Sequence, residues 1–210
     1  MKKAKKVIAL TLCAVMLVVG SVAGTMAYLT STTATVTNTF TVGNVTITLD
    51  EADVNLYGEK VVVVDGKDVV ATADNMNQVE RVTSNDYKLI PGHNYVKDPT
   101  VHVGATSEDS WLIVKVTNPI SGIEAGTTIA NQMADKWTAI DEEKGIYAYN
   151  DVVSAGNDIV VFEEFTIAGT ADVASHNGES ITVQAYAIQE DGFDSAAAAW
   201  AAAPLQAWLN

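Results

Sequence analysis

The sequence predicts a mainly β protein: a jelly-roll-like antiparallel β-sandwich with a short inserted helix and a C-terminal helix. Many short segments alternate apolar and polar residues or collect β-branched residues, and turn-forming residues separate them. Only two stretches carry a helical pattern. The chain of 210 residues has the length of one such domain, which we place at residues 28–210.

The first 27 residues have the pattern of a secretory signal peptide. Four lysines precede an apolar run at residues 7–22, and the small residues Thr25 and Ala27 precede a predicted cut between Ala27 and Tyr28. The alternative is a permanent membrane anchor, but the run is shorter than the roughly 20 residues that a spanning helix needs. We therefore expect a secreted mature chain with no stable membrane span.

Cleavage would make the chain more acidic and free of cysteine. Of the 12 Lys and Arg, four leave with the signal peptide, whereas all 26 Asp and Glu stay, so the mature net charge is −18. Cys13, the only cysteine, also leaves, so no disulfide is expected. The strong negative charge argues against nucleic acid and anionic lipid as partners.

The mature chain begins with a predicted strand at residues 33–42, which alternates strictly. Val36, Phe40 and Val42 fall on one face together with Asn38, and threonines fall on the other. A Gly-Asn pair then shifts the phase before a second strand at residues 45–49. A two-residue turn would make the two strands a hairpin with Val42 opposite Val45, and a bulge between two sheets fits the pattern equally well.

Further strands and two helices follow at short spacing. The first helix is expected at residues 127–136. The second begins at the alanine-rich tail from Asp194, with Asp194 or Ser195 as its N-cap, and we expect it to pack on the sandwich rather than on a partner. The remaining strands are predicted at residues 60–64, 69–73, 87–90, 100–103, 111–117, 137–140, 146–149, 159–167 and 181–188. Two pairs of them are predicted to form hairpins, one with its turn at residues 65–68 and the other with an acidic turn at residues 141–145.

Several of these segments together resemble the TasA/camelysin family of exported proteins. The resemblance lies at the predicted cleavage site, in the first two strands, and in a Pro-Gly turn with the strands that follow it. The matching segments are Gly24-Thr25-Met26-Ala27-Tyr28-Leu29-Thr30, residues 37–49, Leu89-Ile90-Pro91-Gly92, Lys97-Asp98-Pro99-Thr100-Val101 and residues 110–116.

The resemblance implies a jelly-roll-like sandwich, export from a Gram-positive bacterium, and cleavage by a SipW-type signal peptidase. Its best-known members are subunits of biofilm matrix fibres, in which the N-terminal segment adds as a strand to the next subunit. We therefore expect an extracellular or cell-surface fibre subunit whose partner is another copy of itself or a related matrix subunit. Val36, Phe40 and Val42 would then be the residues of the assembly strand. The alternating pattern of residues 33–42 also fits an ordinary first strand, in which case the protein would be a monomeric adhesion or glycan-binding module.

Camelysin, described as a cell-surface metalloprotease, is the enzymatic alternative. The three histidines, His93, His102 and His176, do not form a His-Glu-x-x-His motif, although Glu163 or Glu164 could join His93 or His102 in space. The mature chain also lacks a nucleophile motif and an EF-hand, and its acidic clusters are typical of surface turns. We expect no catalytic residue, cofactor or metal site.

Overall fold

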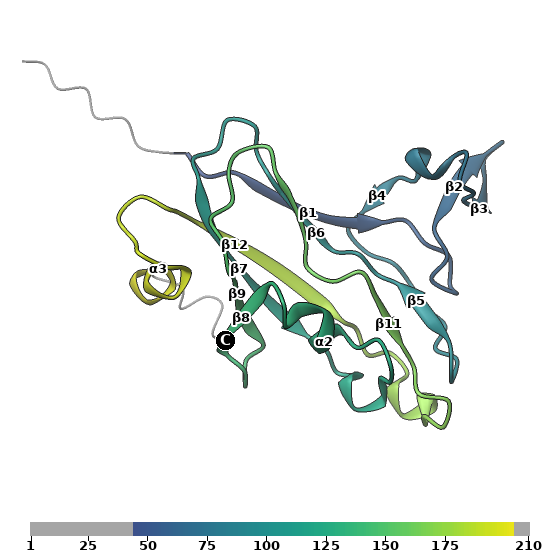
Figure 1. The fold of residues 1–210 in the computed structure, drawn as a ribbon. Coiled ribbons are helices and arrows are strands. Elements are labelled where there is room, and N and C mark those ends of the chain that lie inside the picture. Colours follow the sequence, from purple (N-terminus) through teal and green to yellow (C-terminus); the bar gives the residue numbers. More distant parts are fainter. Residues whose placement is uncertain (1–43, 204–210) are drawn as a thin grey trace, which may run out of the picture. The chain divides into compact units, whose positions relative to one another are not determined.

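The computed structural model describes residues 44–203, which form a mainly β fold (Figure 1). The predicted fold class is confirmed: the sheets are antiparallel, and a short inserted helix and a C-terminal helix accompany them. The strands are β1 (Ile47–Ala52), β2 (Val61–Val64), β3 (Lys67–Val70), β4 (Arg81–Val82), β5 (Asn94–Val96), β6 (Thr100–Val103), β7 (Ser110–Thr117), β8 (Trp137–Asp141), β9 (Ile146–Tyr149), β10 (Asp158–Val160), β11 (Glu164–Thr166) and β12 (Thr182–Gln189).

Two four-stranded sheets make up the sandwich. One has the order β10-β6-β1-β4, and the other has the order β12-β7-β9-β8. The chain crosses between them from β6 to β7, from β9 to β10 and from β11 to β12. The pairing of β10 with β6 continues as the pairing of β11 with β5, after a short interruption at residues 97–99 and 161–163.

The core lies between the two sheets. Alternate residues of β7, Leu112, Val114 and Val116, face it, together with Val101 of β6 and Phe165 of β11. The other face of β7 is also covered, because the C-terminal helix packs on it: Ile113 is fully buried in a second cluster together with Ala196. The continuous apolar run of this strand follows from burial on both faces.

The two predicted helices are present but short. α2 (Ile129–Met133) is capped by the Thr128 side chain, which accepts a hydrogen bond from the Asn131 amide, and it buries Ile129 and Met133 in the core. α3 (Ala196–Ala202) is capped in the same way by Ser195. It contacts β7 and β9 and covers the outer face of their sheet, as predicted, and it lies beside that sheet in Figure 1.

Strands β2 and β3 form a separate hairpin. The structure turns at Asp65 and Gly66, both with positive φ, which is the geometry of a two-residue type I′ turn. The sequence pattern predicted this hairpin but placed its turn over residues 65–68, so β3 begins two residues earlier than expected.

Two predicted strands differ from the structure. Residues 87–90 form no ladder, because the Lys88 amide donates to the Leu56 carbonyl and the Ile90 amide donates to the Tyr95 hydroxyl. The strand predicted at residues 159–167 is split into β10 and β11. Short strands β4 and β5 were not predicted, nor were the 3-10 turns η1 (Met76–Gln78), η2 (Ser121–Ile123) and η3 (Val173–His176).

The predicted signal peptide and first strand lie outside the described residues, as does the N-terminal boundary of the domain. Among the residues that are described, no helix is long and apolar enough to cross a membrane.

Candidate functional site

Within residues 44–203, one side of the sandwich is open, along β1 of one sheet and β12 of the other. β1 pairs with β6 along residues 47–50 and with β4 only at Glu51 and Ala52. Within residues 44–203, no strand pairs with the other side of β1 at residues 47–50. In the same part of the chain, β12 pairs with β7 alone. At residues 47–50, β1 therefore presents backbone groups with which no strand of the described part of the chain pairs.

The open side also carries apolar side chains that are incompletely covered. β1 and β12 contact each other across the sandwich. Ile47 and Leu49 of β1, and Val183 and Ala185 of β12, pack against the core but stay half-exposed. An unpaired edge with apolar neighbours is the kind of surface to which another strand adds.

Beyond this open edge, the end of β1 is fixed by a buried ion pair. The Lys97 Nζ lies 2.6 Å from the Glu51 carboxylate, and both residues are less than 10% exposed. Asn85 donates one hydrogen bond to the Glu51 carboxylate and another to the Ala52 carbonyl, each 2.9 Å long. Two groups from distant segments thus satisfy the buried carboxylate.

Asp98 extends this polar cluster to two more segments, those of Lys60 and Arg81. Its carboxylate accepts a 2.7 Å hydrogen bond from the Ala52 amide and lies 2.7 Å from the Lys60 Nζ. Arg81 approaches Asp98 at 3.5 Å and pairs more closely, at 2.7 Å, with Asp50. We call Asp50, Glu51, Lys60, Arg81, Lys97 and Asp98 the β1 charge cluster. It ties β1 to β4 and to the segment before β6.

His102 links three neighbouring strands next to this cluster. From β6, its Nε2 lies 2.9 Å from Asp50 of β1, and its Nδ1 lies 2.7 Å from Asp158 of β10. Burial lowers the pKa of His102, but the hydrogen bonds and the negative charges of the two carboxylates outweigh burial and raise it. Burial likewise raises the pKa of Asp50, but hydrogen bonds from His102 and Arg81 outweigh it, so the net shift is downward.

These opposite shifts predict how the stability depends on pH. Protonated His102 stabilises the fold fully below its unfolded pKa of about 6.5, and this contribution is lost as the pH rises through the higher folded pKa. Ionised Asp50 stabilises the fold fully above its unfolded pKa of about 3.9. This stabilisation is lost as the pH falls through the lower folded pKa, where the carboxylate takes up a proton.

We expect the native chain to lose more unfolding free energy between about pH 5.5 and pH 8.5 than the His102→Gln variant does. Urea unfolding followed by circular dichroism at both pH values measures the difference. His176→Gln is the matched control, because it removes a different histidine–carboxylate pair. Equal pH dependence of the native chain and His102→Gln would contradict the assignment.

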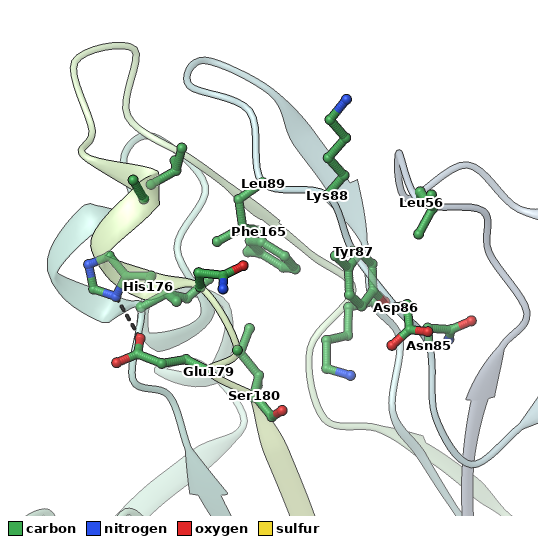
Figure 2. Close-up of a pocket in the computed structure, with 17 residues that line it drawn as sticks. Leu56, Asn85, Asp86, Tyr87, Lys88, Leu89, Phe165, His176, Glu179 and Ser180 are labelled. Atoms are coloured by element: carbon green, nitrogen blue, oxygen red, sulfur yellow. Dashed lines mark hydrogen bonds and ion pairs between the residues drawn. The ribbon is translucent and has the colours of Figure 1, made fainter.

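A pocket of about 940 Å³ opens where β1 ends and β12 begins. Figure 2 shows Asn85, Asp86, Tyr87 and Leu56 on one side of it, and His176, Glu179 and Ser180 on the other. Lys97, which holds Glu51 of β1, also lines the pocket, and so does Ile181, which directly precedes β12. The pocket is therefore located at one end of the open side.

Aromatic rings give the pocket a rigid apolar wall. Tyr87 meets Phe165 and Tyr95 edge-on at 5.7 and 5.8 Å, and Tyr95 stacks on Phe165 at 5.1 Å. The Tyr87 hydroxyl donates to the Val96 carbonyl. Burial raises the pKa of Tyr87, and the charges of Glu51 and Asp98 raise it further, so the phenol is neutral at physiological pH.

The structure places the three histidines at separate positions. His93 Nε2 lies 2.9 Å from the Tyr57 carbonyl, and its ring packs on Tyr95. His176 pairs with Glu179 at 2.6 Å, on the pocket rim. In the described part of the chain, no three His, Cys, Asp or Glu side chains are grouped so that they could hold a metal ion.

The glutamates that could have joined His93 or His102 have other partners. The Glu164 carboxylate accepts a hydrogen bond from Asn94, and the Glu163 amide donates to the Gln132 side chain.

The other predicted site residues, Ala27, Tyr28, Val36, Phe40 and Val42, lie outside the described residues. Sequence reasoning missed the β1 charge cluster and the pocket. The one signal for the cluster was a charged pair, Lys97-Asp98, which only Pro99 separates from a predicted strand. No protein-family model, no curated protein and no solved structure matches this chain.

Proposed function

We propose that this protein is an exported structural subunit that assembles into extracellular fibres by strand addition. Residues 33–42 of one copy would pair with β1 on the open side of the next copy. The observation that supports this proposal is the edge of β1 at residues 47–50, which has no strand on its outer side within residues 44–203.

The added strand matches this edge in pattern. Phe40 and Val42 on its apolar face would cover the partly exposed Ile47, Leu49 and Val183, and Val36 continues that face beyond the open edge, while its threonines would face water. The segment contains no charge and no proline, so nothing in it opposes pairing with an open edge. Backbone hydrogen bonds would supply affinity, and the apolar side chains would set the register.

Head-to-tail addition of this kind leads to filaments. The donor strand and the acceptor edge are different surfaces of the same chain, so each added copy presents a new edge and the contact does not close. The proposed setting is the extracellular matrix or the cell surface. The signal-peptide pattern of the first 27 residues and the resemblance to biofilm fibre subunits support that setting.

Deletion of residues 28–35 tests the mechanism. It keeps Val36, Phe40 and Val42 but shortens the free segment, so we expect the truncated mature chain to stay folded and to form far fewer filaments. Circular dichroism checks the fold, and electron microscopy of equal concentrations of truncated and full mature chain counts the filaments. If the truncated chain stays folded and forms filaments as readily as the full mature chain, the mechanism is wrong.

A further inference from the structure

Strand addition along β1 leaves the pocket beside it without a role. We propose that this pocket binds Tyr28 and Leu29, the first two residues of the mature chain of a neighbouring copy, together with the free amino group that cleavage creates. This inference rests on the proposed strand addition and on the cut before Tyr28.

The position of the pocket follows from an antiparallel addition to β1. If Phe40 lies opposite Ile47, then decreasing residue numbers of the added strand run along β1 toward Asp50. β4 already occupies the next two positions, Glu51 and Ala52, so the added strand must leave the ladder there. At this end of β1, Glu51 is bonded to Asn85 and Lys97, which both line the pocket.

The length of the remaining segment is sufficient for this route. In that register, residue 37 lies opposite Asp50, so residues 33–36 of the added segment run beyond the open edge, and nine residues, 28–36, remain outside the ladder. An extended segment of that length spans up to about 30 Å. The first residues of the donor can therefore reach a pocket that begins beside the end of β1.

The chemistry of the pocket fits this dipeptide. Its walls include the aromatic ring of Tyr87 and the aliphatic side chains of Leu56, Leu89 and Ile181, which suit an aromatic and a leucine side chain. Its rim carries the exposed carboxylates of Asp86 and Glu179, which lie on opposite sides in Figure 2. The lining also holds the ammonium groups of Lys88 and of Lys97, the latter paired with Glu51. A free α-amino group is positively charged near neutral pH, so it would be attracted to the two rim carboxylates.

Peptide competition tests the inference on the full mature chain. A synthetic peptide of residues 28–42 is added to growing filaments, and the concentration that halves their elongation is measured by light scattering. Replacing Tyr28 and Leu29 by serine should raise that concentration at least about tenfold, because the apolar contacts in the pocket are lost. Acetylation of the peptide amino group should raise it several-fold, and this effect should vanish for Asp86→Asn/Glu179→Gln filaments.

A Phe40→Asp peptide separates the two proposals. If Phe40→Asp abolishes inhibition while the serine-substituted or the acetylated peptide inhibits as well as the native one, strand addition stands and the pocket assignment is overturned. If the native peptide does not inhibit elongation at all, strand addition itself has failed. Weaker inhibition by both the serine-substituted and the acetylated peptide, with Phe40→Asp inactive, is the expected result.

Discussion

Replacing Lys97 by methionine is expected to lower the free energy of unfolding by about 3–5 kcal/mol. The substitution keeps most of the side-chain volume but removes the ammonium that lies 2.6 Å from Glu51. Glu51 is 5% exposed, so its carboxylate would stay out of water with Asn85 as its remaining side-chain partner. Urea denaturation of native and variant protein, followed by circular dichroism, measures the loss.

Two further variants test whether the burial of the ion pair causes this loss of unfolding free energy. Lys60→Met removes another ion pair of the β1 charge cluster, but the Lys60 side chain is 31% exposed and Asp98 keeps Arg81 and the Ala52 amide. Its cost should therefore be about 1 kcal/mol or less. The double variant Glu51→Gln/Lys97→Met removes both charges and should recover part of the stability that Lys97→Met loses. Equal losses for Lys97→Met and Lys60→Met would refute the explanation.

Local patterns were sufficient to predict much of the fold. The β8–β9 hairpin was predicted from two short apolar segments around an acidic turn, and the pairing of Trp137 with Tyr149 confirms it. The helix from Asp194 was predicted from its alanines and its capping residue, and Ser195 does cap it. In these elements, neighbours in the sequence supply both the turn and the hydrogen bonds, so the pattern carries the information.

The pattern was misleading where distant groups take the backbone hydrogen bonds. Residues 87–90 have the composition of a strand, yet their amides donate to Leu56 and to the Tyr95 side chain. Residues 159–167 are rich in β-branched and aromatic residues on both sides of a break between two ladders, and the apolar side chains of Val161 and Phe162 stay buried at the break. Burial and strand pairing are separate properties, and the sequence pattern reports burial.

The candidate site was less predictable than the fold. Glu51 and Lys97 are 46 residues apart, and nothing in the sequence states that they pair. The histidines are visible in the sequence, but their partners are not: those of His102, Asp50 and Asp158, come from two other strands, β1 and β10. The open side of β1 likewise depends on which strands pair, so it emerges only from the topology.

In the proposed assembly, the β1 charge cluster would act on affinity as well as on stability. It holds the end of β1 to Asn85, Arg81 and Lys97, while residues 47–50 keep an open edge. An acceptor edge that is already fixed loses little conformational freedom when a strand adds to it, which favours binding. The same cluster forms one border of the pocket, so the edge and the pocket share a rigid support.

Replacing Gly145 by alanine is expected to lower the free energy of unfolding by at least about 3 kcal/mol. Gly145 ends the turn between β8 and β9 with φ +66°, a conformation that disfavours a residue with a Cβ atom. A Cβ built there would lie 2.1 Å from the Val116 carbonyl oxygen of β7, and this backbone atom belongs to a central strand. To relieve the clash, β9 would have to move away from β7 and expose Ile146, which is fully buried.

Gly156→Ala is the control that separates strain from the clash. Gly156 has a similar φ of +76°, but a Cβ at that position meets nothing within 4 Å. Its replacement should therefore cost about 1–2 kcal/mol, the cost of the left-handed backbone conformation alone. Urea unfolding of both variants gives the two losses under the same conditions. The excess for Gly145→Ala then measures how closely the turn lies against β7, and the absence of any excess would mean that the sheet yields at this point without loss of stability.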